Sequence, residues 1–358
     1  MTQQQSAAGG FHIPSLDGIR ALAAFIVFVS HAGNQDLIPG GFGVTVFFFL
    51  SGYLITTLLR REHEAAGAIS LKKFYIRRAF RLFPPLYIVL FVVLGLSFLG
   101  VFSTERMTWG GVLSQFGYWS NYYYILHEGK GFVPGTALTW SLAVEEHFYL
   151  VFPIFFIFLS SRFDCQGMAK VFVGLCIIVL VWRLILVLGF SVSHDYTYRA
   201  TDARFDSLLY GCLLAVWRNP IYWSSAERSE DPSGWHYLVL AGAVALLLFT
   251  FLYRDGVFRE TLRYSLQGVA LFPIFWMAVR YSNLWLFRWL DLPFMRLYGL
   301  ISYTFYLCHL VILHWLERYL GETLIWAIAS FSLAFGCSYV MHIAVEKPIG
   351  RLRKRFKI

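Results

Sequence analysis

The stretch LDGIRALAAFIVFVSHAG, residues 16–33, has about the length of a membrane span, and most of it is apolar. It nevertheless carries Asp17 and Arg20 near one end and His31 near the other. An ionisable group inside a membrane helix costs roughly a few kcal/mol, so one that is kept there usually faces a partner or a cavity. This stretch therefore predicts a membrane protein with a polar site enclosed by its helices.

The composition agrees with a membrane protein. Of the 358 residues, 58% are hydrophobic and 14% are charged, whereas a soluble domain has about 25% charged residues. The net charge of +9 does not indicate nucleic-acid binding, because basic residues of membrane proteins collect in their cytosolic loops. We expect membrane lipids and no nucleic acid among the partners.

Ten segments are apolar enough to be helices that cross the hydrocarbon core, which takes about 20 residues each. The sixth is short, and the first and the fourth contain charges. The sequence thus predicts an all-α polytopic membrane protein with about ten transmembrane helices, near 15–33, 42–60, 82–102, 138–160, 171–190, 204–218, 237–253, 264–281, 296–316 and 323–345.

The distribution of basic residues predicts the orientation. With a cytosolic N-terminus, the inner loops hold 20 of the 30 Lys and Arg residues and the outer loops hold 8, while Arg20 and Arg183 lie within spans. This bias predicts that both termini are cytosolic. We expect an N-terminal cytosolic tail over 1–12, a transmembrane domain over 13–346 and a basic cytosolic tail over 347–358.

Other classes of segment and site find no support. The first ten residues are polar and lack Lys and Arg, so we expect no cleavable signal peptide, and we expect no separate soluble domain. The sequence contains no CxxC pair, Walker loop or GxGxxG motif. We therefore expect neither a metal site nor a disulfide framework, and no machinery for nucleotide hydrolysis or redox chemistry.

Arg20 and His31 are predicted to share one face of the first helix. Their separation of 11 residues turns an α-helix by about three full turns plus roughly 20°, and it places them about 16 Å apart along the axis. Snorkelling of Arg20 and a structural hydrogen bond of His31 are alternatives. Together, the two positions favour a shared cavity.

A second cluster lies in FYIRRAFRLFPPLY, residues 74–87, at the cytosolic mouth of the third span. Arg78 and Arg81 are i,i+3 neighbours, and Arg77 adjoins them. Guanidinium groups suit phosphate or carboxylate, although ordinary anchoring by basic residues is an alternative. We expect Pro84 and Pro85 to kink or restart the helix just after the arginines.

A third cluster lies in ALTWSLAVEEHFYLVFP, residues 137–153. Glu145 and Tyr149 share one side of the helix at i,i+4. A carboxylate in this apolar setting is a functional candidate. For either Glu145 or Glu146, which points elsewhere, a structural ion pair with Arg183 or Arg204 is the alternative.

Several further polar residues have both structural and functional interpretations. In residues 40–55 the glycines allow close helix packing, and Ser51 is expected to pack or hydrogen-bond rather than act as a nucleophile. The aromatic loop 102–137 is an interfacial belt or a platform for sugar rings. Polar ladders formed by Asp202, Arg204 and Asp206, and by Tyr303, Tyr306 and His309, are local networks or contacts to an acceptor. From these residues alone, the chain is a membrane transferase or a transporter.

Motifs in order along the chain sharpen this choice. SLDGIRALAAFIVFVSHAG, FFFLSGYLITTLL, FYIRRAFRLFPPLY, LTWSLAVEEHFYLVFP, TDARFDSLLYG, ISYTFYLCHL and VEKPIGRLRKR together resemble the acyltransferase-3 family of integral membrane O-acyltransferases, from about residue 13 to the end. That family acylates bacterial surface glycans such as lipopolysaccharide O-antigen, and relatives modify peptidoglycan, Nod factors and macrolides. Many relatives carry an additional periplasmic hydrolase-like domain, and no such domain is recognised here.

The resemblance implies residue roles. The family's Arg followed after ten residues by His falls on Arg20 and His31, and its Arg-x-x-Arg falls on Arg78 and Arg81. The remaining motif, Trp-Ser-Leu…Glu…Phe-Tyr, falls on Trp140, Ser141, Leu142, Glu145, Phe148 and Tyr149.

The expected function is transfer of an acyl group from cytosolic acyl-coenzyme A, most simply acetyl-CoA, to a hydroxyl of a bacterial surface polysaccharide. The enzyme would lie in the bacterial inner (plasma) membrane, alone or as a homo-oligomer. The alternatives are a transporter of acyl groups or glycan precursors that performs no chemistry, and an acyltransferase acting on a small molecule such as a macrolide.

Each candidate residue has an expected part in this reaction. His31 would act as general base or accept the acyl group itself, and Glu145 would orient or charge its imidazole. Arg20, Arg77, Arg78 and Arg81 would hold the donor. The acceptor-binding or supporting positions are Ser51, Tyr53, Trp140, Tyr149, Asp202, Arg204, Tyr306 and His309.

Overall fold

The computed structural model describes residues 13–33, 39–104, 106–223 and 231–355. These residues form an all-α structure, in which an isolated β-bridge joins Met107 and Gly131. The expected fold class, an all-α polytopic membrane protein, is confirmed. The sidedness of the termini stays a prediction.

Each of the ten predicted spans coincides with a long helix of the described chain. These helices are α1 (Pro14–His31), α2 (Gly40–Ala66), α3 (Leu71–Phe98), α6 (Thr139–Ser160), α7 (Cys165–Leu188), α9 (Thr201–Val216), α11 (Gly234–Leu252), α13 (Leu262–Arg280), α14 (Pro293–Leu320) and α15 (Leu324–Met341). Eight of them are long and apolar enough to cross a membrane. The two others are α1, whose titratable residues lower its hydropathy, and α9, which has 16 residues.

Shorter helices fill the connections. Between α3 and α6 lie α4 (Trp109–Phe116) and α5 (Ser120–Leu126), between α7 and α9 lies α8 (His194–Arg199), and between α11 and α13 lies α12 (Gly256–Glu260). The 3₁₀ turns η1 (Pro220–Tyr222) and η2 (Arg288–Asp291) precede α11 and α14, and the π-helical turn η3 (His342–Glu346) joins α15 to α16 (Lys347–Arg355). Residues 347–355, expected as a tail, are therefore helical.

The helix α3 differs from expectation at its prolines. We expected Pro84 and Pro85 to kink or restart the helix. The helix does not restart, because the backbone is helical without a break from Leu71 to Phe98. In the same turn, the carbonyl of Leu82 accepts a hydrogen bond from the Tyr303 hydroxyl at 2.8 Å. The arginines and the following apolar span thus belong to one helix.

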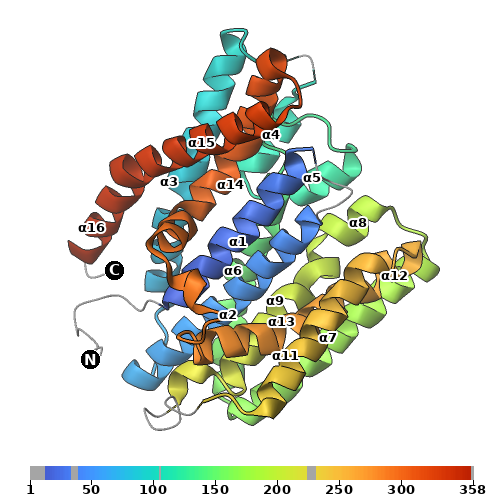
Figure 1. The fold of residues 1–358 in the computed structure, drawn as a ribbon, viewed down its shortest axis with the longest axis vertical. Helices are drawn as coiled ribbons and strands as arrows, with labels where there is room; N and C mark the ends of the chain where they lie inside the picture. Colours follow the sequence, from blue (N-terminus) through green and yellow to red (C-terminus); the bar gives the residue numbers. More distant parts are fainter. Residues whose placement is uncertain (1–12, 34–38, 105, 224–230, 356–358) are drawn as a thin grey trace.

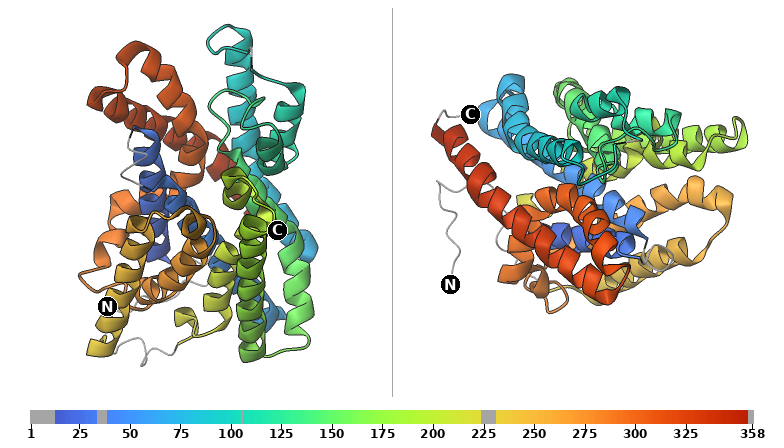
Figure 2. Two further views of the ribbon diagram at one scale, coloured as in Figure 1. Left: turned by 90° about the vertical axis from the view of Figure 1, so that its right-hand side faces the viewer. Right: turned by 90° about the horizontal axis from the view of Figure 1, so that it is seen from above.

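The charged helix α1 lies inside the bundle. It packs against α2 on one side and α14 on the other, while α2 packs in turn against α9, and α14 against α15 (Figures 1 and 2). Leu16, Ala21, Ala24 and Val27 of α1 are all buried. Other helices rather than lipid therefore surround most of the segment that carries Asp17, Arg20 and His31.

Glycines set the spacing of α2 and α9. A Cβ atom on Gly52 would lie 1.9 Å from the backbone oxygen of Leu208, and one on Gly211 would lie 1.9 Å from that of Phe49. Small residues of this kind let helix backbones approach within a membrane. The expected packing role of the residue 40–55 glycines is thus confirmed at Gly52.

A buried ion pair ties α7 to α9. Arg183 donates through Nη1 and Nη2 to the two carboxylate oxygens of Asp206, at 2.8 and 2.6 Å, and both side chains are fully buried. The Ser265 hydroxyl of α13 also donates to Asp206, at 2.8 Å. The partner of Arg183 is therefore Asp206, and neither Glu145 nor Glu146 takes that place.

Breaking this ion pair should destabilise the fold. Removing one partner leaves a buried charge uncompensated, which costs about 3–5 kcal/mol. We expect Asp206→Asn to lower the thermal unfolding midpoint of the detergent-purified protein clearly. Glu128→Gln, which breaks the exposed Glu128–Lys130 pair, should leave the midpoint nearly unchanged, because exposed pairs contribute about 0–1 kcal/mol. Equal midpoints for the two variants would contradict the prediction.

Candidate active site

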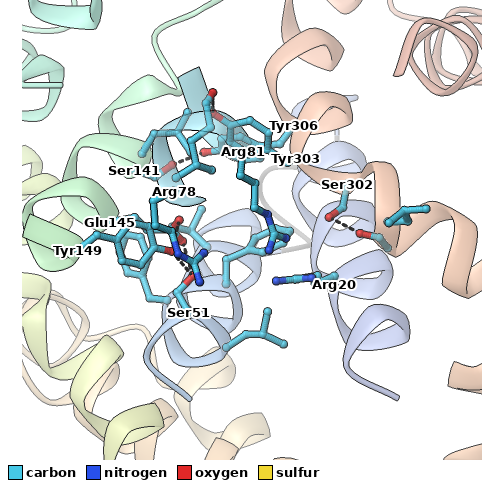
Figure 3. Close-up of a pocket in the computed structure, with 18 residues that line it drawn as sticks. Arg20, Ser51, Arg78, Arg81, Ser141, Glu145, Tyr149, Ser302, Tyr303 and Tyr306 are labelled. Carbon is cyan, nitrogen blue, oxygen red and sulfur yellow. Dashed lines mark hydrogen bonds between the residues drawn. The ribbon is translucent and has the colours of Figure 1, made fainter. Parts of the chain in front are cut away.

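A cavity lies where five helices meet, and we call it the Arg20 cavity. It receives Arg20 from α1, Ser51 from α2, Arg78 and Arg81 from α3, Glu145 and Tyr149 from α6, and Ser302, Tyr303 and Tyr306 from α14 (Figure 3). Five of the seven motif segments found in the sequence therefore meet around one space.

One wall of the Arg20 cavity is a compact hydrogen-bond cluster. The Ser51 hydroxyl donates to Glu145 Oε1 at 3.0 Å, and the Tyr149 hydroxyl lies 3.0 Å from Ser51 Oγ and 3.2 Å from Glu145 Oε2. The guanidinium carbon of Arg78 lies 5.2 Å from the centre of the Tyr149 ring. Ser51 thus hydrogen-bonds as the sequence predicts, and the cluster holds Glu145 and Tyr149 beside Arg78.

The opposite side of the cavity is cationic. Arg20 and Arg81 point toward the same space as Arg78 (Figure 3). The ion pair of Arg20 with Asp17 is long, at 3.5 Å, and the lining holds a single carboxylate, Glu145. Three guanidinium groups around one carboxylate leave an excess of positive charge, so the cavity suits a ligand with several anionic oxygens.

Arg77 does not belong to this group. Its Nη2 donates to Glu62 Oε2 at 2.8 Å, and the residue is absent from the lining of the Arg20 cavity. The sequence placed it with Arg78 and Arg81 because the three are near neighbours. Consecutive helical residues point about 100° apart, and Arg77 consequently faces the end of α2 instead of the cavity.

A larger cavity, which we call the His31 cavity, adjoins the Arg20 cavity. Val44 and Tyr306 line both cavities. The expectation that Arg20 and His31 share one cavity is therefore wrong as stated. The helical spacing does put them on one side of α1, but the side chains of α2 and α14 divide the space between them.

The partner of His31 is a second histidine. His31 Nδ1 lies 2.9 Å from His309 Nε2, and the two rings stack with centroids 5.2 Å apart. His309 Nδ1 lies 2.8 Å from the carbonyl oxygen of Tyr306 and 3.2 Å from that of Phe305. Carbonyl oxygens only accept hydrogen bonds, so Nδ1 of His309 carries a proton.

This network assigns the tautomer of His31. With both rings neutral, Nε2 of His309 is an acceptor, and Nδ1 of His31 must donate to it. The basic lone pair of His31 is then on Nε2, the ring nitrogen that makes no hydrogen bond among the described residues. We expected Glu145 to orient His31. The structure instead gives that position to His309 and places Glu145 with Ser51 and Tyr149.

Tyr306, which lies between the two cavities, is fixed by hydrogen bonds to residues at the start of α6. Its hydroxyl lies 2.7 Å from Ser141 Oγ and donates to the Leu138 carbonyl at 3.2 Å. Leu138 also lines the His31 cavity. The Trp-Ser-Leu motif of α6 thus fixes the wall at Ser141, while Trp140 lines the His31 cavity and packs on Tyr198 with ring centroids 4.9 Å apart.

Three further candidates lie outside both cavities. Tyr53 is fully buried and donates to Asn219 Oδ1 at 2.8 Å, so it links α2 to the segment after α9. Asp202 accepts hydrogen bonds from Tyr122, Tyr196 and Trp182. Arg204 is buried and donates to the Tyr198 carbonyl and to Thr45 Oγ1. Of the two alternatives for Asp202, Arg204 and Asp206, a local ion-pair network among them is wrong, because Asp206 pairs with Arg183.

Sequence reasoning missed the arginines of the His31 cavity, which are Arg199, Arg254, Arg259 and Arg263. A signal for them was present. Arg254, Arg259 and Arg263 fall within ten residues in a loop predicted to be outside, where Lys and Arg are normally scarce. From the aromatic loop 102–137, Tyr124 reaches this cavity.

The amino-acid sequence is similar to those of known proteins. The pattern of the acyltransferase domain family matches residues 13–343. The peptidoglycan O-acetyltransferase OatA of Listeria monocytogenes is 33% identical over 317 residues, which cover 83% of this chain and 49% of that protein. The O-acetyltransferase OatA of Staphylococcus aureus (strain NCTC 8325) is 31% identical over 319 residues, which cover 86% and 52%.

The chain spans about half the length of these curated relatives, and no solved structure matches it significantly. The family match covers every residue named above in the two cavities, from Arg20 to His309. With its membrane helices and the motif residues gathered at two adjoining cavities, this chain belongs to the acyltransferase-3 family.

Proposed function

We propose that this protein transfers an acetyl group from acetyl-CoA to a hydroxyl of a bacterial surface glycan, as a multi-pass protein of the plasma membrane. The observation that carries the proposal is the pair of adjoining cavities. One is lined by Arg20, Arg78 and Arg81 and the other by His31, with Val44 and Tyr306 between them. The O-acetyltransferase names of the relatives support acetyl transfer, and one of those names specifies peptidoglycan.

The Arg20 cavity would take the donor. Coenzyme A carries several phosphate charges, and guanidinium groups bind phosphate through paired N–H donors. Arg20, Arg78 and Arg81 supply these donors, and the cluster of Glu145 and Tyr149 holds Arg78 in place. The thioester end must then reach His31, which requires the Tyr306 side chain to move aside.

His31 would act as the general base. Its Nε2 takes the proton of the acceptor hydroxyl as the hydroxyl oxygen attacks the thioester carbonyl carbon. The carbon–sulfur bond then breaks, the new ester stays on the acceptor, and the coenzyme A thiolate takes up one proton. His309 holds His31 in the required tautomer through the 2.9 Å hydrogen bond to Nδ1.

The proposal is tested by the release of free coenzyme A from acetyl-CoA by protein purified in lipid nanodiscs, with a surface-glycan extract as acceptor. We expect acceptor-dependent release with the natural sequence and a loss of roughly 100-fold or more in His31→Ala, because proton transfer by a positioned base contributes about that much. Mass spectrometry of the glycan should show the added acetyl group.

Two results would overturn the proposal. Unchanged transfer in His31→Ala would remove the role given to this histidine. Bound acetyl-CoA or glycan without release of coenzyme A in the natural sequence would favour a transporter that performs no chemistry.

Substitutions of His309 test the tautomer assignment. A Gln side chain still offers an oxygen that accepts from His31 Nδ1, whereas Leu offers none. We therefore expect His309→Leu to lower kcat by roughly tenfold or more, with little change in KM for acetyl-CoA, and His309→Gln to recover part of the loss. Equal activity of the two variants would contradict the assignment.

The donor site is tested by a matched set of arginines on α3. Arg78→Gln and Arg81→Gln should each weaken acetyl-CoA binding by about 10- to 100-fold, the effect of losing a hydrogen bond to a charged group. Arg77→Gln lies on the same helix but outside the cavity, and it should leave the affinity nearly unchanged. Titration calorimetry on the three proteins would place the donor elsewhere if Arg77→Gln had the largest effect.

A further inference from the structure

The His31 cavity is lined by four arginines that the proposed acetyl transfer does not use. Arg199 comes from α8, Arg254 and Arg259 from the segment between α11 and α13, and Arg263 from the first turn of α13. They come from two separate parts of the chain and meet at one opening. Basic residues are scarce on the outer side of membrane proteins, so this group needs a ligand or partner to explain it.

In the described part of the chain, direct carboxylate partners are missing for two of these arginines, Arg259 and Arg263. The cavity lining contains no Asp or Glu residue. Asp195 forms an ion pair with Arg199. Glu260 lies 3.8 Å from His194 and within range of the charges of Arg263 and Arg259. Among the described residues, neither Arg259 nor Arg263 forms an ion pair with a carboxylate, and Nε of Arg263 is buried without a hydrogen-bond acceptor.

A buried cation behind the lining adds to this potential. Arg204 is fully buried, and both of its hydrogen bonds go to neutral groups, the Tyr198 carbonyl and Thr45 Oγ1. Its guanidinium carbon lies 4.1 Å from the centre of the Tyr264 ring, which lines the cavity. Burial and the charges of Arg263 and Arg199 also lower the pKa of His194 at the cavity rim.

Aromatic rings stand beside the arginines. The Arg199 guanidinium lies 3.8 Å from the centre of the Tyr124 ring and 4.9 Å from that of Tyr198. Trp140 packs against Tyr198 in the same lining. Rigid aromatic surfaces give apolar contact area at low entropic cost, and sugar rings have apolar faces that fit them. Charge recognition and sugar stacking are thus available together, in the cavity that also holds His31.

We propose that the His31 cavity is an anion-recognition site for the acceptor, which takes a glycan unit carrying a carboxylate or phosphate group close to the hydroxyl that is acylated. This inference rests on the proposed function and specifies its acceptor class. Arg263 and Arg259 bind the anionic oxygens, Arg199 with Tyr124 and Trp140 holds the sugar ring, and the hydroxyl faces His31.

Binding of three sugars that differ at one carbon tests the proposal. The probes are methyl glucoside, methyl glucuronide and methyl glucoside 6-phosphate, added to protein in nanodiscs of phosphatidylcholine without donor. We expect one or both acidic probes to bind at least tenfold more tightly than the neutral sugar, because each charged hydrogen bond is worth about that factor. The difference between the two acidic probes identifies carboxylate or phosphate as the recognised group.

Variants locate the site. Arg263→Gln and the exposed Arg259→Gln should each remove about tenfold of the preference for the acidic probe. Arg318→Gln is the matched control, since Arg318 is absent from this lining and donates to the carbonyl of Val101. A preference that persists in the first two variants, or equal affinity for the acidic and neutral probes, overturns the proposal.

Two further measurements keep the outcomes separate. Acetyl-CoA binding to Arg263→Gln and Arg259→Gln should stay normal, which shows that these variants are folded and that the donor site is intact.

If coenzyme A release proceeds but no acidic probe is preferred, this inference fails while the proposed function stands. If an acidic probe binds but no release occurs, the proposed function fails alone. Tight competition by phosphatidylglycerol nanodiscs, with no probe binding, identifies a lipid site and overturns the inference.

Discussion

The structure depends on the cost of placing ionisable groups in lipid. Because of Asp17, Arg20 and His31, the mean hydropathy of α1 is lower than that of the eight helices that could cross a membrane by their composition. It is kept in the bundle by the helices that enclose it, α2 and α14. The enclosure also makes the site, because the polar side chains that α1 cannot expose to lipid face the two spaces bounded by these same neighbours.

Much of the fold could be predicted from the sequence, since apolar length and the cost of buried charge act locally along the chain. Each of the ten expected segments coincides with a helix, and eight of these helices are long and apolar enough to span a membrane. The largest difference is at the start of α3, where the chain stays helical through Pro84 and Pro85. The membership of the Arg20 cavity was also largely predictable, because Arg78, Arg81, Glu145 and Tyr149 each lie at a recognisable spacing on one helix. Arg77 is next to Arg78 in sequence but points in another direction around the helix, so it does not line this cavity.

Pairings between distant segments could not be predicted. Which residue contacts His31 depends on how α14 lies against α1, and nothing in a single helix encodes the 2.9 Å contact with His309, 278 residues away. For the same reason, the pairing of Arg183 with Asp206 could not be predicted from the sequence. Three arginines of the His31 cavity form an unusual cluster in a loop predicted to be on the outer side. The number of basic residues on each side indicates orientation, but it does not show which of these residues lie together.

The wall between the two cavities has a consequence for the cell that harbours this protein. Val44 and Tyr306 line both spaces, so a single layer of side chains separates the two cavities. A continuous column of water through the bundle would conduct protons and discharge the electrochemical gradient of the membrane. An apolar side chain beside an aromatic ring tethered to Ser141 forms a constriction of the kind that excludes water. The same residues that divide the two cavities would therefore also block a path for water and protons through the bundle.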